Sequence, residues 1–414
     1  MELSKKLTII SVCIITAIIV GMVGASIALS LTRSGTYLPY TPGTENEGTH
    51  SPHFEKLSEI YALIDNFYYT EIDPDTMIQG AIDGMLATLG DPYTFYYSSE
   101  QWNTVSSSRN GDNIGIGIQV QAFDDGNIYV TRVFPGGSAY EAGIQKGDIL
   151  YSANGYMLNA YTPQECTEAI SHVKVPLGEV SELIVLRGEE KIEIHAEYRE
   201  YIMPKTECAI LEGNIGYLSI DEWFGTVNAE VNDAIALFEQ NGVEGIIIDL
   251  RDNPGGYLDY VVDITDLFMP EGVIIYTEDR NGERVYYESD SECVGLPLAV
   301  LVNGSSASAS EVFSIAIQKS GSGTIVGTQT YGKGIVQTTY PVSNDGDNVQ
   351  MTTSRYFAAD GFCLHLEGVT PDIVVEAGEL TREAIITSPN PELDPQLKAA
   401  YDYLLGEIAH EKAE

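Results

Sequence analysis

Two short and almost wholly apolar runs constrain the fold of this chain more than any other feature. Residues 245–250 (GIIIDL) and 298–302 (LAVLV) lack the alternation of a half-exposed strand, so each suits a strand buried on both faces. Strand and helix patterns alternate around them, which predicts an α/β core. The expected strands are 215–220, 245–250, 298–302, 324–327, 334–339 and 349–356, and the expected helices are 227–240, 256–268 and 309–318.

A long apolar run near the N-terminus predicts where the protein resides. Residues 7–32 are 26 consecutive uncharged positions, and about 20 apolar residues suffice to span a bilayer as a helix. Lys5 and Lys6 precede the run, and lysines beside a first span tend to stay cytoplasmic. We expect a cytoplasmic stub and an uncleaved transmembrane anchor in residues 1–33, with the catalytic body outside the cytoplasm. A signal peptide cleaved near residues 25–28 is the alternative, and it would make the protein secreted.

Changes in composition and periodicity divide the rest of the chain. Apolar residues recur at steps of three and four after residue 52 and again after residue 391, which indicates amphipathic helices at both ends of the body. Unpaired amphipathic helices invite self-association, so a homodimer is expected. The expected parts are a linker (34–50), an N-terminal helical region (51–104), a strand-rich domain (105–200), the α/β core (201–378) and a helical tail (379–414).

Charge and motif content exclude several classes of function. The chain has 61 acidic and 21 basic residues, a net charge of −40, and such a field repels the phosphate backbone of nucleic acids. Six histidines without an HExxH spacing and five cysteines without a CxxC pair predict no metal site. No phosphate-binding loop of the GxxxxGK[ST] type is present either, so we expect no metal and no cofactor.

The strand-rich domain carries its own pattern. Residues 124–126 (DDG) and 154–155 (NG) are hairpin turn signals between short strands. Together with residues 115–118 (GIGI) and 134–155 (FPGGSAYEAGIQKGDILYSANG), this order resembles a PDZ domain of the circularly permuted bacterial type. The resemblance implies that a peptide C-terminus adds as a strand while backbone N–H groups hold its carboxylate. The implied peptide-binding residues are Gly115, Ile116, Gly117 and Ile118.

A serine-rich segment of the core offers a nucleophile. Residues 302–311 (VNGSSASASE) lie between an expected buried strand and an expected helix, and a serine at a helix N-terminus gains from the partial positive charge there. Lys333 follows Ser308 by 25 positions and stands between two glycines at the start of an apolar strand. Burial lowers the pKa of a lysine, which then serves as a general base in a Ser-Lys dyad. Gln337 returns to the same strand face, where its amide would orient the amine.

A glycine turn supplies the third element of the expected site. Residues 249–256 (DLRDNPGG) end a buried strand in a Pro-Gly-Gly turn, which presents backbone N–H groups at the carboxyl edge of the sheet. Such groups can form an oxyanion hole. Taken alone, the segment also fits an ordinary connection between a strand and a helix.

The order of these motifs resembles the carboxyl-terminal processing (tail-specific) serine proteases. The resemblance covers nearly everything after the linker: helical region, PDZ domain, DLRxNPGG, SASASE, TxGKGxxQ and a closing GVxPDxxV at residues 368–375. It implies Ser308 as nucleophile and Lys333 as general base, with Gln337 in support. By position, the oxyanion-hole amides fall on Gly255 and Ala309.

Three positions depart from the pattern of that family. Thr328 replaces an acidic residue, and Gln318-Lys319 stands where Gln-Asp is frequent. After the PDZ helix many members carry Ile-Arg-Gly, with an arginine implicated in coupling ligand binding to activation, whereas this chain has Val-Lys-Val-Pro at 173–176. The dyad is unchanged, and the resemblance does not extend to the same gating in this chain.

These observations lead to a first hypothesis and two alternatives. We expect a membrane-anchored serine endopeptidase whose partners are protein substrates with exposed C-terminal tails, recruited by the PDZ domain. The first alternative is a catalytically degenerate PDZ adaptor. The second pairs Ser308 with His365 and an aspartate, which is disfavoured because no GxSxG motif surrounds Ser308.

Overall fold

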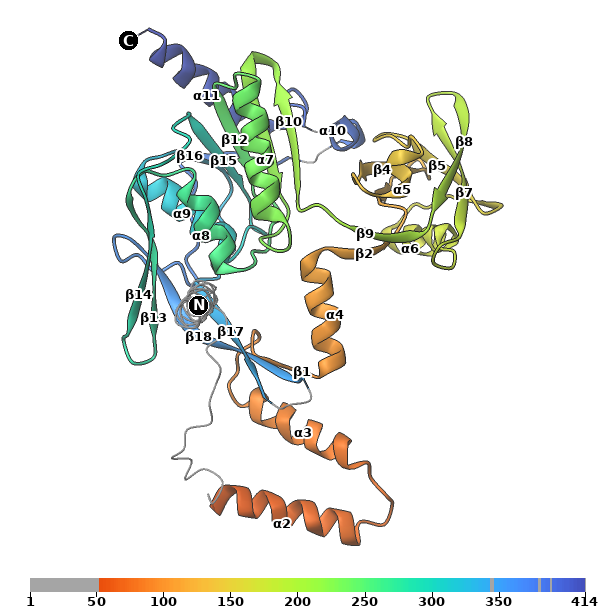
Figure 1. Ribbon diagram of the computed structural model, residues 1–414, viewed down its shortest axis with the longest axis vertical. Helices are drawn as coiled ribbons and strands as arrows, with labels where there is room; N and C mark the ends of the chain where they lie inside the picture. The colour runs from red at the N-terminus through yellow and green to blue at the C-terminus, as the bar shows by residue number, and fades with distance from the viewer. Residues whose placement is uncertain (1–51, 343–345, 379–380, 388, 414) are drawn as a thin grey trace, which may run out of the picture. The chain divides into compact units, whose positions relative to one another are not determined.

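The computed structural model describes residues 52–342, 346–378, 381–387 and 389–413 (Figure 1). They form two units: one combines the described residues up to Trp102 with 337–353, and the other holds the remainder. The expected anchor at 7–32 and the linker at 34–50 lie outside the described residues. Within the described ranges, no helix combines the length and apolar character that crossing a membrane requires.

The first unit contains the N-terminal helices that the periodicity predicted. Helix α2 spans Pro52–Phe67 and α3 spans Pro74–Ala87, with the Asp73 side chain accepting a hydrogen bond from the backbone at the start of α3. Strand β1 (Phe95–Tyr97) pairs antiparallel with β18 (Asn348–Ala358). Helix α2 buries none of its residues, and its exposed apolar side chains are Phe54, Leu57, Ile60, Leu63 and Phe67.

The second unit begins within α4 (Ser99–Asn110), which runs across the expected boundary at residue 104. Its strand-rich domain has the order β3-β4-β5-β7-β8. Both hairpin turns are confirmed, and Asn154 and Gly155 have φ values of 49° and 83°, as this tight turn requires. The elements are β2 (Asp112–Gly115), β3 (Ile118–Ala122), β4 (Ile128–Val133), α5 (Ser138–Glu141), β5 (Ile149–Ala153), β6 (Tyr156–Met157), α6 (Pro163–Ile170), β7 (Val180–Arg187), β8 (Glu190–Glu197) and β9 (Arg199–Ile202).

The α/β core is confirmed as a six-stranded sheet of order β10-β11-β12-β15-β16-β19. All neighbouring strands from β11 to β19 are parallel, and β10 runs antiparallel at one edge. Four of the six predicted strands lie in this sheet and are present within one residue, whereas 334–339 and 349–356 correspond to β17 (Ile335–Pro341) and β18 of another sheet. The strands of the six-stranded sheet are β10 (Thr206–Leu211), β11 (Ile215–Ile220), β12 (Gly245–Asp249), β15 (Leu298–Val302), β16 (Thr324–Gly327) and β19 (Ile373–Val374).

Helices cover both faces of this sheet, which explains the unbroken apolar runs (Figure 1). Ile246 and Ile248 of β12 pack with three helices on one face, whereas Ile247 packs with α11 on the other. Successive side chains of a strand point to opposite faces, so both layers need apolar residues. The helices of the first layer are α7 (Val227–Gln240), α8 (Leu258–Asp266) and α9 (Ala309–Ser320), and α11 spans Pro395–Glu411.

Two expected helix starts are wrong, for identifiable reasons. Helix α8 begins at Leu258 rather than residue 256, because Gly256 is held in an extended bridge to Trp223. A β-carbon at Gly256 would lie 2.4 Å from the Trp223 carbonyl oxygen, so only glycine fits there. The tail helix begins at Pro395 rather than 391, because the Asp394 side chain caps it.

A long hairpin escaped the sequence analysis. Strands β13 (Gly272–Asp279) and β14 (Arg284–Ser289) pair antiparallel, and β13 also pairs with residues 354–358 of β18. This hairpin and the end of β18 add a second sheet to the core. The end of β18 carries the buried Tyr356.

Candidate active site

Ser308 occupies a strained position between β15 and α9. It is the N-cap of α9, its φ and ψ are 58° and −115°, and its exposed fraction is 6%. Residues other than glycine rarely adopt a positive φ, so the surrounding structure must impose this conformation. The Ser308 N–H donates to Glu311 Oε2 over 2.9 Å, and the preceding Ala307 N–H donates to the Asn253 carbonyl over 3.0 Å. Neighbouring groups therefore fix the backbone of this serine.

One buried carboxylate joins the serine segment to the lysine segment. Glu311 Oε2 accepts hydrogen bonds from the N–H groups of both Ser308 and Lys333, over 2.9 Å and 2.8 Å. Its other oxygen, Oε1, accepts from the Gly332 N–H over 2.7 Å and from Thr330 Oγ1 over 2.6 Å. The main chains of Ser308 and Lys333 thus meet at a single oxygen atom. Nothing in the sequence marks Glu311 for this role, because three of its four partners lie 19, 21 and 22 residues further along the chain.

The two glycines beside Lys333 let this segment lie against residues 364–367. A β-carbon at Gly334 would lie 2.2 Å from the backbone nitrogen of His365. Gly332 has a φ of 89°, and its carbonyl accepts a hydrogen bond from the Leu366 N–H over 2.8 Å. Lys333 itself is half-buried. The glycines therefore allow the two backbone segments to approach closely. In this arrangement the Lys333 backbone N–H donates to Glu311.

We expect Gly334→Ala to destabilise the core. The added methyl group would overlap the main chain of His365, and overpacking of this kind costs about 1–3 kcal/mol, or more where backbone must move. Urea denaturation followed by circular dichroism should show a lower unfolding midpoint. Gly304→Ala is the matched control, since its β-carbon would meet only the Gln329 carbonyl at 3.8 Å. Equal midpoints for the two variants would contradict the prediction.

The candidate oxyanion-hole residues lie beside Ser308. A β-carbon at Gly255 would lie 2.7 Å from Ser308 Cβ and 3.1 Å from the Ala309 nitrogen, so the structure brings these three residues together. Ala309 is the first residue of α9, where an N–H group has no partner within the helix. The Gly255 N–H donates to Asn253 Oδ1 over 2.9 Å. A bound oxyanion would have to replace or share that bond.

An ion-pair network supports the turn after β12. Arg251 forms ion pairs with Asp249 at 2.6 Å and with Asp394, the N-cap of α11, at 2.8 Å. Burial alone would lower the pKa of Arg251, but the two carboxylates raise it above its ordinary value. Tyr217 Oη also donates to Asp249 Oδ2 over 2.9 Å. The turn that carries Gly255 is therefore tied to the C-terminal helix.

Gln337 lies in β17 (Ile335–Pro341) and belongs to the first unit. Its side-chain amide donates a hydrogen bond to Thr352 Oγ1 over 3.3 Å. The expected support of Lys333 by Gln337 therefore stays a prediction.

The expected peptide-binding residues lie at the start of the strand-rich sheet. Gly115 ends β2, Ile116 is buried, and Ile118 begins β3, which is an edge strand of its sheet with α6 beside it. Gly117 has a φ of 83°, and a β-carbon there would lie 2.6 Å from Gly137 Cα. The GIGI sequence thus combines one buried anchor with a backbone that only glycine permits.

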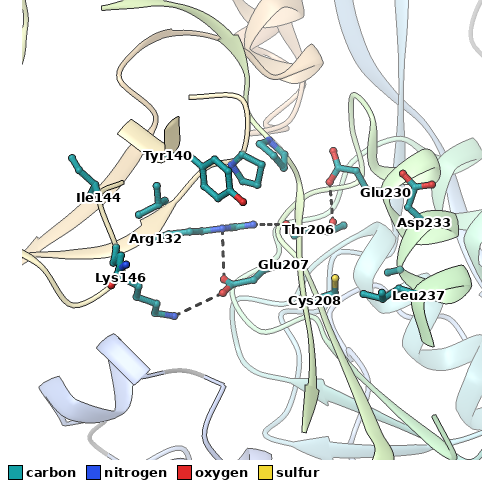
Figure 2. A pocket seen from close by; sticks show the side chains of 15 residues that line it. Arg132, Tyr140, Ile144, Lys146, Thr206, Glu207, Cys208, Glu230, Asp233 and Leu237 are labelled. Atoms are coloured by element: carbon teal, nitrogen blue, oxygen red, sulfur yellow. Dashed lines mark hydrogen bonds and ion pairs between the residues drawn. The ribbon is translucent and has the colours of Figure 1, made fainter. Parts of the chain in front are cut away.

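A cavity of about 730 Å³ lies between residues of the strand-rich domain and residues of the core (Figure 2). Arg132 Nε and Lys146 Nζ lie 3.6 Å and 3.9 Å from the Glu207 carboxylate, and burial lowers the pKa of Lys146. Tyr140 and Leu237 are among its apolar lining residues. The fifteen described residues that line it include neither Ser308 nor Lys333, so this cavity is separate from the candidate active site.

Comparison with known proteins supplies the family. Residues 214–375 match Peptidase family S41, 104–178 match the PDZ domain, and 20–101 match the N-terminal domain of the activating protease CtpB. The carboxy-terminal processing protease CtpA of Bacillus subtilis (strain 168) is 30% identical over 377 residues, which cover 90% of this chain and 78% of that protein. The chain belongs to peptidase family S41. The family resemblance of the sequence motifs is thereby confirmed.

Two further comparisons show how much of the chain the similarity covers. A CtpA-like serine protease of Staphylococcus aureus (strain N315) is 31% identical over 332 residues, covering 79% of this chain and 66% of that protein. The match thus spans just under two thirds of this relative's length. A solved S41 protease structure from Bacteroides fragilis NCTC 9343 has a TM-score of 0.58 at 16% identity, covering 84% of this chain and 97% of the other. This likeness supports the fold.

Proposed function

We propose that this S41 chain is a serine endopeptidase that cleaves proteins near their C-terminal tails, with Ser308 as nucleophile and Lys333 as general base. The observation that carries the proposal is the shared Glu311 oxygen, which holds the backbones of both residues. The strained φ of Ser308 adds support, because strain of this kind clusters at catalytic positions.

The proposed reaction proceeds through an acyl-enzyme. Ser308 Oγ attacks the scissile carbonyl carbon while its proton passes to a neutral Lys333 Nζ. The N–H groups of Gly255 and Ala309 stabilise the resulting oxyanion, and the amine leaves with the proton from Lys333. Water then attacks the ester, Lys333 accepts the water proton, and that proton returns to Ser308 Oγ as the acid product leaves. Gln337 is proposed to orient the lysine amine.

Substrate recruitment is proposed for the PDZ domain. The edge strand β3 offers unpaired backbone groups to an added peptide strand, and Gly115–Ile118 would hold the terminal carboxylate. Apolar tails are proposed, because β3 and α6 carry apolar side chains that are only partly buried in the core: Ile118, Val120, Ala122, Ala169 and Ile170.

The proposal extends to location and assembly. The uncharged run at 7–32 supports a membrane anchor with an extracytoplasmic body. The exposed apolar face of α2 supports a homodimer, since monomers seldom leave such a face in water.

Replacing the proposed base discriminates between the hypotheses. We expect Lys333→Ala to reduce cleavage of an unfolded protein with an apolar C-terminus by at least about 10³-fold, because Ser308 then lacks a proton acceptor. His365→Ala should stay active, because His365 has no role in the proposed dyad. Its Nδ1 is buried and has no hydrogen-bond partner among the described residues. The reverse pattern would establish the Ser-His-Asp alternative. If the chain is a catalytically degenerate adaptor, it should bind tail peptides, and a fluorophosphonate should not label its Ser308.

A further inference from the structure

A buried tyrosine contacts the proposed nucleophile. Tyr356 Oη lies 3.0 Å from Ser308 Oγ, within hydrogen-bond distance, and only 4% of the Tyr356 side chain is exposed. Nothing in the sequence distinguishes this tyrosine from the other 25, since it stands 48 residues after the serine. Its hydroxyl nevertheless touches the oxygen that would attack the substrate.

The backbone of Tyr356 is held on two sides. Its N–H donates to the Gly334 carbonyl over 3.1 Å, directly beside Lys333, and its strand pairs with Thr277 of β13. A phenol on a rigid strand keeps its position without help from substrate. The Tyr356 side chain therefore contacts Ser308 from a strand whose backbone is hydrogen-bonded to Gly334, the residue after the proposed base.

Its environment keeps this phenol protonated. Burial raises the pKa of Tyr356 to about 12, the hydrogen bond with Ser308 acts in the opposite direction, and the nearby Glu311 carboxylate adds to the increase. At neutral pH the hydroxyl therefore retains its proton and can act as a hydrogen-bond donor. In the resting structure either oxygen of the pair can be the donor.

We propose that Tyr356 is a catalytic residue that donates a hydrogen bond to Ser308 Oγ while this oxygen passes its proton to Lys333. The inference rests on the proposed role of Ser308. Where transfer of the proton runs ahead of the new C–O bond, Oγ carries partial negative charge and can only accept. The phenol alone then donates within the pair, and hydrogen bonds to a charged oxygen are up to about twice as strong as neutral ones.

The proposed hydrogen bond would accelerate the reaction because it is stronger in the transition state than in the enzyme–substrate complex. Only interactions that are stronger in the transition state than in the ground state increase the rate of the chemical step. The phenol keeps its proton throughout, so the proton balance between Ser308 and Lys333 is unaffected. The same donor would stabilise Oγ when it departs from the acyl-enzyme.

Tyr356→Phe in the full chain tests the proposal. We expect kcat to fall about 10- to 100-fold with KM unchanged, the range for losing a hydrogen bond to a charged group. The rate of Ser308 modification by a fluorophosphonate should fall by a similar factor, with full final labelling. The final extent of labelling measures the fraction of folded protein. If labelling is complete but slower, the variant is folded and its Ser308 is less reactive.

Tyr401→Phe provides the matched control. Tyr401 is a partly buried tyrosine of α11 that packs on the other face of the core sheet, and its hydroxyl donates to the Glu212 carbonyl over 3.1 Å. We expect its kcat to equal that of the wild type.

The outcomes separate the inference from the proposed function. A Tyr356→Phe enzyme as fast as wild type would overturn the inference, and so would equal losses in both tyrosine variants. A faster variant would also overturn it, because Tyr356 would then hold the serine proton away from Lys333. If Ser308→Ala still cleaves substrate, the proposed function itself fails and the inference fails with it.

Discussion

Ser308→Ala should abolish peptide hydrolysis, with a loss of kcat on the order of 10⁴- to 10⁶-fold. The substitution removes the attacking oxygen and leaves the Glu311 bond to the residue 308 backbone intact. Stability should change little, because the Tyr356 contact is the side-chain hydrogen bond that is lost and such bonds contribute about 1 kcal/mol. Single-turnover cleavage assays with mass spectrometry of the products would measure the effect.

A neighbouring serine supplies the control for this result. Ser305 lies in the same loop but is exposed, so Ser305→Ala makes the same chemical change away from the proposed site. We expect wild-type kcat from it. Cleavage by Ser308→Ala within tenfold of the wild-type rate would contradict the assignment of the nucleophile.

Glu311→Ala should damage both the fold of the site and its activity. The change leaves three backbone N–H groups and the Thr330 hydroxyl without their shared acceptor, in a pocket where Glu311 has no exposed surface. Breaking a buried charged network costs about 3–5 kcal/mol, a large share of the 5–15 kcal/mol that typically stabilises a domain. We expect a clearly lower urea midpoint and at least about a 100-fold lower kcat.

An isosteric change refines the Glu311 prediction. Glu311→Gln keeps the volume but turns an NH₂ group toward N–H donors, so its activity should lie between those of Glu311→Ala and wild type. Glu367→Gln is the control, since Glu367 is exposed and borders the same glycine segment. Wild-type kcat and stability in Glu311→Ala would show that the shared oxygen does not position the dyad.

Local patterns predicted most of the core elements, because a strand buried on both faces has a signature in sequence. The apolar runs at 245–250 and 298–302 became β12 and β15 without ambiguity. The β13–β14 hairpin was missed although Asn281-Gly282 marks its turn, because its strands lack clean alternation: β13 is largely buried and β14 largely exposed. Its partner, β18, lies about 70 residues away, a pairing that local periodicity does not report.

The candidate site was predictable as a set of motifs but not as a geometry. Ser308, Gly255 and Ala309 lie together as the motifs implied. Glu311 and Tyr356 escaped notice because their importance comes from contacts made across distant segments, with Lys333 in one case and Ser308 in the other. A glutamate in the first turn of a helix is common, and so is a tyrosine in a strand, so neither residue type carries a signal alone.

The last helix has a practical bearing on how this protein can be shortened. Helix α11 fills one side of the central sheet with Leu397, Ala400, Leu404 and Ile408, and its cap pairs with Arg251. Removing the chain from Asp394 onward would strip a hydrophobic layer from the sheet and leave the Arg251 guanidinium with Asp249 as its remaining carboxylate partner. Cleavage within α11 should therefore inactivate the enzyme without any contact with Ser308 or Lys333.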